Sequence, residues 1–204
     1  MIVVPCEQGS PEWIAARLGI PTSSAFNRIL TPKTMKLSAG AHGYLCELVA
    51  EKMIGASLDP FVSEWMERGS ELEDSAVARY EFDRDMDCEK VGFILHDTLM
   101  VGCSPDRLVG EDGGLEIKCP SPRVHVENLL GMADKHRTQV QGSLWITGRA
   151  WWDLLSYHPE MPPAIVRIER DEAFIGKLAE AVSDFLENLQ QAKETLGVAE
   201  VATP

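Results

Sequence analysis

The chain has 204 residues, enough for one domain with a sizeable core, whereas two domains would each be small. Its formal net charge of −13 at pH 7 argues against a generally basic, nucleic-acid-binding exterior. The sequence has no apolar run of about 20 residues and no signal-peptide pattern, so we expect a cytoplasmic protein without a membrane span.

The N-terminal third predicts two helices and a polar loop. Ser10-Pro11 is typical of a helix start, with Ser10 as the N-cap and Pro11 in the first turn, and the helix should end near Gly19. Residues 22–24 (Thr-Ser-Ser) should open the next helix. Hydroxyl groups at such a position usually cap the helix, although a helix N-terminus also binds phosphate. Segment 31–39 is polar and predicts a loop.

The next elements are two helices and a strand. Residues 38–54 predict a helix that Gly55 ends, because glycine is common just after a helix. Residues 63–82 predict a long helix that carries many acidic side chains, most of them on a solvated face. Residues 88–96 predict a strand that leads into the central part of the chain.

A β-hairpin is predicted at the centre of the sequence. Segment 101–109 is rich in strand-forming residues, 110–114 (Gly-Glu-Asp-Gly-Gly) is typical of a turn, and 115–119 is a short second strand. Folding the chain about Asp112-Gly113 places Glu116 opposite Val109. Asp106 then lies near the same end of the hairpin.

Charged residues gather on this hairpin. Glu116 and Lys118 share one face because side chains alternate along a strand, and Asp106 adds a second carboxylate. Two close carboxylates favour a hard cation such as Mg²⁺, to which the carbonyl of Ile117 could add an oxygen. Lys118 could hold and help deprotonate a metal-bound water. The alternative is an ordinary exposed hairpin, which an isolated Asp…Glu-x-Lys pattern favours.

The last third predicts two helices, two strands and a long helix. Ser121-Pro122 starts a helix that ends near Gly131, and residues 135–146 form the next one. In that second helix Gln139 and Gln141 lie about 200° apart around the axis, so only one can face the hairpin. The predicted strands are 150–157 and 164–169, followed by an amphipathic helix from about 171 to 196.

These elements predict a single α/β domain over residues 1–204. A mixed central sheet of about five strands should carry helices on both sides. The polar tail after about residue 196 is expected to be flexible. Trp151 and Trp152 should point to opposite faces of their strand, one of them into the core.

Several ordered motifs resemble a known family. Pro105-Asp106 followed by Glu116-Ile117-Lys118 resembles the PD-(D/E)xK nuclease motif, and the strings Cys-Ser-Pro-Asp and Leu-Glu-Ile-Lys-Cys-Pro resemble the phage lambda exonuclease (YqaJ-type viral recombinase) family. Further similar blocks span roughly residues 7 to 190: Trp13-Ile-Ala-Ala-Arg17-Leu-Gly, Thr22-Ser-Ser24, Gly69 with Glu73, Gln139-Val-Gln141 and Ile168-Glu-Arg-Asp-Glu172. Arg107 departs from the family, which usually has glycine after the aspartate, and adds a cation beside the expected metal site.

The resemblance implies a set of site residues. Asp106, Glu116 and the Ile117 carbonyl would hold one Mg²⁺, while Asp106 and Glu73 would hold a second, and Mn²⁺ would be able to replace Mg²⁺. Lys118 and Gln139 would orient the attacking water, with Gln139 bonded to Lys118 or to the water itself. A DNA-binding group for the 5′-phosphate would comprise Arg17, Ser24 and Ser104.

The resemblance also implies an activity and partners. The activity is 5′→3′ digestion of one strand of duplex DNA from a phosphorylated end, which leaves a 3′ overhang for recombination by strand annealing. The expected assembly is a homotrimeric ring around DNA, with a single-strand annealing protein as partner, in a bacterial or phage-infected cell. Alternatives are a structure- or site-specific endonuclease and a non-catalytic DNA-end-binding scaffold. The five scattered cysteines support neither disulfides nor an iron–sulfur cluster.

Overall fold

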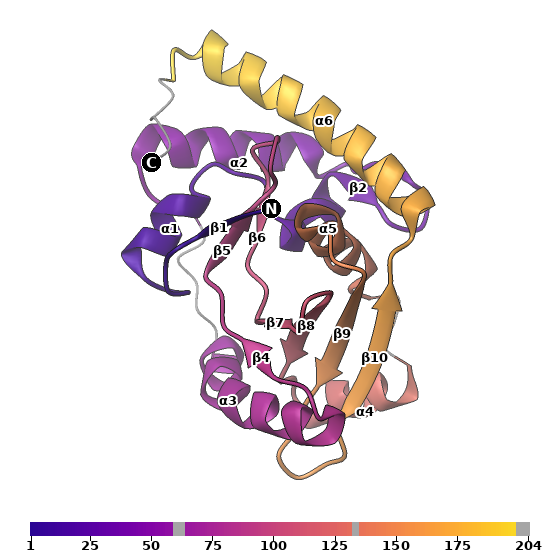
Figure 1. Ribbon diagram of the computed structural model, residues 1–204. Coiled ribbons are helices and arrows are strands. Elements are labelled where there is room, and N and C mark those ends of the chain that lie inside the picture. Colours follow the sequence, from indigo (N-terminus) through magenta and orange to yellow (C-terminus); the bar gives the residue numbers. More distant parts are fainter. Residues whose placement is uncertain (59–63, 132–134, 199–204) are drawn as a thin grey trace.

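The computed structural model describes residues 1–58, 64–131 and 135–198, with only the helix path for 64–71. Its helices flank a mixed β-sheet, which confirms the predicted α/β class (Figure 1). The helical elements are α1 Pro11–Arg17, the 3₁₀ helix η1 Ser23–Arg28, α2 Ala41–Ile54, α3 Glu64–Arg84, α4 Pro122–Leu130, α5 Arg137–Thr147 and α6 Glu172–Thr195. Within the described residues, no helix combines the length and the apolar character needed to cross a bilayer.

The central sheet has five strands in the order β10-β9-β8-β7-β4. The β8–β9 pair is parallel and the other three pairs are antiparallel, so the sheet is mixed as predicted. A second sheet has the order β1-β5-β6, and β2 pairs with β3. The strands are β1 Ile2–Val4, β2 Leu30–Thr31, β3 Lys36–Leu37, β4 Cys88–Glu89, β5 Phe93–Leu95, β6 Gly102–Cys103, β7 Arg107–Val109, β8 Gly113–Lys118, β9 Trp151–Ser156 and β10 Ala164–Glu169.

Two predicted strands are each divided between the two sheets. Segment 88–96 contains β4 and β5, and segment 101–109 contains β6 and β7. The single-strand predictions were therefore wrong. Between β6 and β7 lies Ser104-Pro105-Asp106, where proline has no N–H to continue a ladder, so the chain leaves one sheet and enters the other. Asp106 therefore lies where the chain passes from one sheet to the other.

The hairpin register also differs from the prediction. Val109 pairs with Gly113 and Arg107 with Leu115, so the turn is centred on Glu111 and Glu116 does not lie opposite Val109. Continuing the register by one pair puts Glu116 opposite Asp106. The turn is held from inside the protein by buried Arg149, whose Nη1 donates to the carbonyls of Gly110 and Gly113 at 2.9 and 2.6 Å.

Most predicted helices are present, with shifted ends. The Ser10 side chain accepts a hydrogen bond from the Trp13 N–H and so caps α1, as predicted. Gly55 has φ +68° and ends α2, although α2 starts at Ala41 rather than at residue 38. The loop predicted at 31–39 was partly wrong, because it contains the β2–β3 hairpin. Gly69, from the family motif, lies in α3, but its surroundings are outside the described residues, as is the tail after residue 198.

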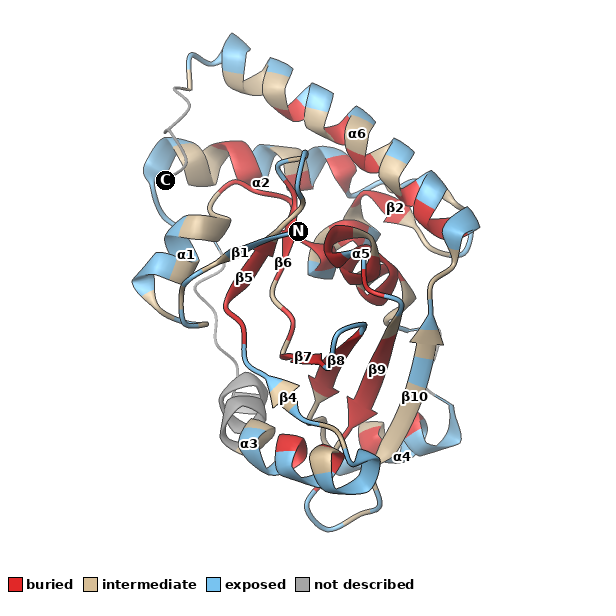
Figure 2. Cartoon of the chain, in the orientation of Figure 1, coloured by how far each residue is buried: buried red, intermediate tan, exposed pale blue. Residues whose placement is uncertain are grey.

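Each face of the central sheet has its own apolar cluster, and strands β7, β8 and β9 are mostly buried (Figure 2). One cluster joins α5, α6 and α2 to Trp152, and the other joins α3 to Leu115, Ile117 and Leu155. Trp152 is fully buried, and a Cβ on Gly114 would lie 2.3 Å from its ring, so a glycine is required there. Even and odd positions of β8 therefore face different helices, α5 and α3 respectively. This division places the charged residues of the hairpin.

Candidate active site

The predicted hairpin residues meet at the end of β8 that is farthest from the turn. Asp106 lies just before β7, and its Oδ2 accepts a hydrogen bond from the Ile117 N–H at 2.5 Å. The Lys118 Nζ donates to Glu116 Oε1 at 2.6 Å. The predicted shared face of Glu116 and Lys118 is thus confirmed. Glu116 is buried, which brings two carboxylates and one ammonium into a small volume.

Gln139 of α5 completes this group. Its Nε2 donates to Glu116 Oε1 at 2.7 Å, so Lys118 and Gln139 converge on the same carboxylate oxygen. Gln139 was expected to bond Lys118 or the attacking water; in this structure its partner is Glu116, and the bond to the water stays a prediction. Gln141 points elsewhere: its Nε2 donates to the Glu169 carbonyl at 2.8 Å. Only one of the two glutamines faces the hairpin, as the helical geometry predicted.

The charges in this group are not balanced. Burial and the nearby Glu116 carboxylate raise the pKa of Asp106 well above its ordinary value, with a smaller contribution from Glu73, against the Ile117 N–H and the Lys118 ammonium. Burial is the largest single effect on the pKa of Lys118 and would lower it, but the charge and hydrogen bond of Glu116 act together with the charge of Asp106 and raise it. Lys118 is therefore protonated at neutral pH, whereas Asp106, with its pKa raised to about 8, keeps its proton there when no cation is bound.

This arrangement fits one divalent cation. Asp106 and Glu116 offer carboxylate oxygens, and the Ile117 carbonyl between the charged positions offers a third, which is the hard oxygen set that Mg²⁺ accepts. A cation there would also relieve the repulsion that raises the pKa of Asp106. In the described part of the chain, no three His, Cys, Asp or Glu side chains gather closely enough to hold a metal. Glu73 is therefore not grouped with Asp106 and Glu116.

Glu73 lies on α3 and is bonded to Arg107 instead. The Arg107 Nη1 donates to Glu73 Oε1 at 2.5 Å and to the Asp106 carbonyl oxygen at 2.6 Å. Its Nη2 makes a longer contact of 3.4 Å with Asp74. Arg107 pairs with Leu115, whose side chain faces α3, so the guanidinium leaves on the side of the sheet opposite to Glu116. The expected extra cation is thus present, but it contacts Glu73.

The residues predicted to bind the 5′-phosphate are only partly brought together. The Arg17 guanidinium lies 3.9 Å from the centre of the Trp13 ring, and the Trp13 Nε1 donates to Ser104 Oγ at 3.0 Å. Trp13 therefore connects Arg17 to Ser104, two residues before Asp106. Ser24 is exposed near the start of η1, and its hydroxyl lies 3.1 Å from that of Thr22. Thr22 in turn bridges to Gly102 of β6, on the same segment as Ser104.

Trp13 and Gln8 have contacts that the sequence did not reveal. The Gln8 Nε2 donates to the Val91 and Pro105 carbonyls at 2.9 and 2.7 Å, which ties the N-terminal segment to the residue before Asp106. Both residues form hydrogen bonds with segments that are distant in the sequence. The only signal for Trp13 was its presence in a family motif, and Gln8 had none.

A short basic segment, Lys135-His136-Arg137, lies just before Gln139, and its three side chains have different surroundings. Arg137 Nη2 donates to Asp171 Oδ2 at 2.5 Å, which anchors the start of α6. Lys135 is exposed. Burial, together with the charges of Lys118 and Lys135, lowers the pKa of His136 to about 4, so its ring is neutral at pH 7.

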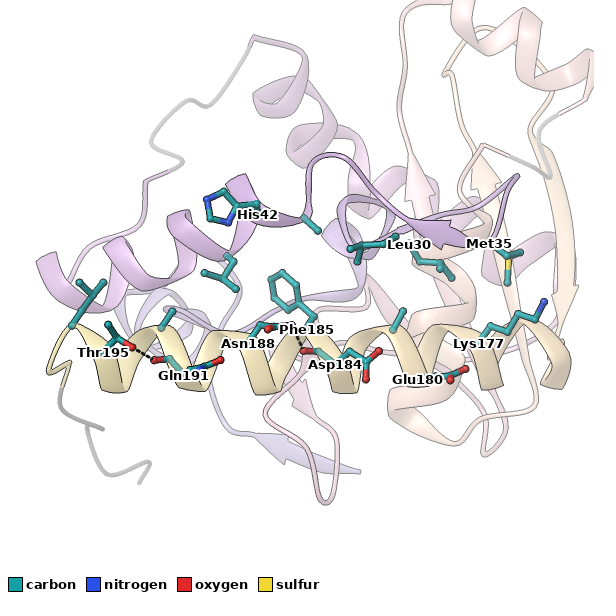
Figure 3. Close-up of a pocket in the computed structure, with 16 residues that line it drawn as sticks. Leu30, Met35, His42, Lys177, Glu180, Asp184, Phe185, Asn188, Gln191 and Thr195 are labelled. Atoms are coloured by element: carbon teal, nitrogen blue, oxygen red, sulfur yellow. Dashed lines mark hydrogen bonds between the residues drawn. The ribbon is translucent and has the colours of Figure 1, made fainter.

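A groove of about 960 Å³ lies elsewhere, between α2, α6 and the β2–β3 hairpin (Figure 3). Its floor is apolar, with Leu30 and Phe185, while Lys177, Glu180 and Asp184 lie along α6. None of the predicted site residues lines it. The candidate active site is therefore the carboxylate group at the end of β8.

Comparison with solved structures finds the same fold in known exonucleases. The alkaline exonuclease LHK-Exo from Laribacter hongkongensis superposes with a TM-score of 0.83 at 35% identity, covering 92% of this chain and 96% of that one. The structure of LHK-Exo in complex with dAMP gives the same TM-score at 36% identity and the same coverage. A phage-related exonuclease from Haemophilus somnus 129PT shares the fold, with a TM-score of 0.69 at 18% identity over 87% of this chain and 96% of that one.

Sequence comparison gives the family. An uncharacterised protein of Escherichia coli (strain K12), ExoD, is 32% identical over 65 residues, which are 30% of this chain and 75% of that protein. The YqaJ-like viral recombinase domain matches residues 12–150, well over half of the 204 residues, and this range includes every residue of the candidate site. The chain therefore belongs to the YqaJ-like viral recombinase domain family.

Proposed function

We propose that this protein is a metal-dependent exonuclease that digests one strand of duplex DNA in the 5′→3′ direction from a 5′-phosphorylated end. The observation that carries the proposal is the convergence of Asp106, Glu116, Lys118 and Gln139 at the end of β8. The similarity to alkaline exonucleases along nearly the whole chain supports a nuclease. The product would be a 3′ overhang, the substrate of a single-strand annealing protein in recombination.

The residues present define the chemistry. Asp106, Glu116 and the Ile117 carbonyl would hold Mg²⁺, or Mn²⁺ in its place, and the bound ion would supply Lewis-acid activation of water and phosphate. Lys118, whose Nζ lies 2.6 Å from Glu116 Oε1, would orient the nucleophilic water or a phosphate oxygen by donating a hydrogen bond. Gln139 holds Glu116 in place through Oε1.

The DNA end would dock on the α1 side of the site. Arg17 is held by Trp13, which also bonds Ser104 next to the carboxylates, so a phosphate on Arg17 and Ser104 would lie close to Asp106. Ser24 is exposed on the neighbouring η1 and joins the same segment through Thr22 and Gly102. An arginine and hydroxyl groups are suited to a terminal phosphate, because charge-assisted hydrogen bonds are the stronger kind.

We further propose a homotrimeric ring around the DNA. A monomer with a net charge of −13 would hold duplex poorly, whereas a ring can enclose DNA and keep its acidic side outside. The expected result is processive digestion that continues after an excess of unlabelled trap DNA is added. A stable monomer in sedimentation, with digestion stopped at once by the trap, would refute the ring and leave the metal site untouched.

The decisive experiment compares linear and circular DNA. We expect Mg²⁺-dependent loss of one strand from 5′-phosphorylated linear duplex, no cutting of a closed circle, and no reaction in EDTA. Cutting of the circle would indicate an endonuclease instead. Absence of cutting on both substrates, with DNA-end binding retained, would indicate a non-catalytic scaffold.

The proposed 5′-phosphate site is tested by comparing DNA substrates that carry a 5′-phosphate or a 5′-hydroxyl. Wild type should prefer a 5′-phosphate to a 5′-hydroxyl by roughly tenfold to a hundredfold, as for a charged hydrogen bond of about 1.5–3 kcal/mol, and Arg17→Ala should narrow that preference. Arg79→Ala is the matched control, because Arg79 is half-exposed on α3 and paired with Asp83. Equal wild-type rates on the 5′-phosphate and 5′-hydroxyl substrates would contradict the proposed 5′-phosphate site.

A further inference from the structure

The residues expected to hold a second metal ion have different hydrogen-bond partners in this structure, although the Glu73 charge still acts on Asp106. Asp106 lies with Glu116 on the α5 side, while Glu73 is bonded to Arg107, which leaves the sheet on the α3 side. Two metal positions would need Asp106 and Glu73 to share an ion. The described residues contain no group of three carboxylate, thiol or imidazole side chains placed to do this.

Arg107 is well placed to retain Glu73. Its side chain is 6% exposed and that of Glu73 is 27% exposed, so the pair is partly shielded from water and salt. The same Nη1 atom also donates to the Asp106 carbonyl at 2.6 Å, which fixes the guanidinium relative to the metal-binding aspartate. Asp74, the other acidic contact, lies at 3.4 Å with a side chain that is 95% exposed, so it competes weakly for the guanidinium.

Moving Glu73 to a metal ion would leave a buried guanidinium without its main partner. Removing one member of a buried ion pair is costly because the other charge then lacks solvation. A bound divalent cation near Asp106 would also repel Arg107, whose guanidinium contacts the Asp106 carbonyl. Both effects oppose a second ion shared with Glu73. An ion held by Asp106, Glu116 and the Ile117 carbonyl leaves the Glu73–Arg107 pair in place, so only the repulsion acts on it.

We infer that Arg107 is a positioning residue that keeps Glu73 out of the metal centre, so that this chain holds one divalent cation where its resemblance implies two. The guanidinium takes the place of the second cation as the partner of Glu73. This inference rests on the proposed nuclease function, because it concerns the same site. It predicts that the second ion binds at least about tenfold more weakly than in a variant without this guanidinium.

The test counts bound ions and does not use cleavage. Mn²⁺ titration of the full chain without DNA, followed by electron paramagnetic resonance and calorimetry, should give one ion per wild-type chain with the spectrum of an isolated Mn²⁺. Arg107→Gly should bind two ions with a spin-coupled spectrum. Arg107→Gly combined with Glu73→Gln should return to one ion, which assigns the gained ion to Glu73.

Two further variants guard against an unfolded mutant. Glu73→Gln in the wild-type background should leave the count at one, because Glu73 is bound to Arg107 and not to the ion. Asp74→Asn, which removes only the long contact, should also leave one ion and serves as the control for Arg107→Gly. Thermal unfolding of each variant confirms that it is folded before ions are counted.

The outcomes separate this inference from the proposed function. Two ions of similar affinity in the wild type, or loss of one on Glu73→Gln, would overturn the role of Arg107 while leaving a two-metal nuclease intact. A single ion in a folded Arg107→Gly chain would also overturn it. Failure of the wild type to bind any Mn²⁺ would refute both the inference and the nuclease proposal.

Discussion

Acidic side chains lie inside the protein on opposite faces of one sheet, Asp153 on one face and Asp106 with Glu116 on the other. Their charges are neutralised differently. On the α3 face, Asp153 of β9 is fully buried and accepts hydrogen bonds from the Tyr80 hydroxyl at 2.8 Å and from Arg167 Nε and Nη2, both at 2.9 Å. Arg167 also lies over the Trp151 ring at 3.5 Å. The Asp153 carboxylate therefore forms a bidentate ion pair with one guanidinium.

The α5 face has the opposite balance. Asp106 and Glu116 lie close enough that each charge disfavours the other, and among the described side chains Lys118 is the ammonium paired with them. A buried carboxylate is tolerated when its charge is neutralised and its oxygens are bonded, as at Asp153. Without a further cation, ionising both Asp106 and Glu116 costs stability. Burial alone thus does not mark an acidic residue as functional, whereas burial with excess charge does.

The largest expected effect is on cleavage by the unbalanced group. Lys118→Ala, Asp106→Asn and Glu116→Gln should each reduce the cleavage rate by at least about a thousandfold, because they remove the positioning of water and metal, while DNA-end binding persists. Single-turnover digestion of 5′-phosphorylated duplex measures this. Glu111→Gln, at the exposed turn of the same hairpin, is the control and should cleave normally. Wild-type turnover by Lys118→Ala would contradict the motif assignment.

The second prediction concerns the balanced group. Asp153→Ala should lower the free energy of unfolding by about 3 kcal/mol, the lower end for a broken buried ion pair, since Arg167 stays 39% exposed and can be hydrated. Asp106→Asn should not destabilise the metal-free protein, because it removes one of two repelling carboxylates. Urea unfolding in EDTA measures both. Equal losses for the two substitutions would remove the distinction between the faces.

Metal addition should affect only one face. Ca²⁺ at a hundredfold excess over its dissociation constant should stabilise wild type by about 2.7 kcal/mol, as expected for a ligand that binds only the folded state. Asp106→Asn should lose this gain, while Tyr80→Phe should keep it. Thermal unfolding with and without Ca²⁺ provides the measurement. A gain that survives Asp106→Asn would place the cation elsewhere.

The sequence predicted the local parts of this arrangement well. Helix caps such as Ser10, the apolar stripe of α6 and the shared face of Glu116 and Lys118 follow from spacing alone, and the structure confirms them. Selection of Gln139 over Gln141 needed the family resemblance. The geometry then supplied its partner, Glu116.

The missed features depend on contacts between distant segments. The Arg107–Glu73 pair joins residues 34 apart, and the Trp13–Ser104 hydrogen bond joins residues 91 apart, so both depend on how α3 and α1 pack. The hairpin register was missed because five residues with turn propensity allow several centres, and the carbonyl contacts of Arg149 favour one of them. Pairing between segments, rather than local propensity, decided these points.

The smallest expected effect sharpens the comparison at Tyr80. Tyr80→Phe removes one donor to Asp153 but leaves both Arg167 hydrogen bonds, so we expect a loss of about 1 kcal/mol near neutral pH. The loss should also depend on pH. Burial, and then the hydrogen bond to Asp153, raise the pKa of Tyr80 above its ordinary value of 10.0.

The sign of this dependence follows from linkage. Above about pH 10 the unfolded phenol loses its proton while the folded one keeps it, so the Tyr80 contribution is full below about pH 10 and falls as the pH rises further. Wild type should therefore lose stability more steeply than Tyr80→Phe between about pH 9 and 11, and the two unfolding curves should converge. Metal binding to Asp106 and Glu116 should be the same in both proteins. Parallel pH profiles would show that the Tyr80 hydroxyl does not share the charge of Asp153, and the α3 face would then rest on Arg167 alone.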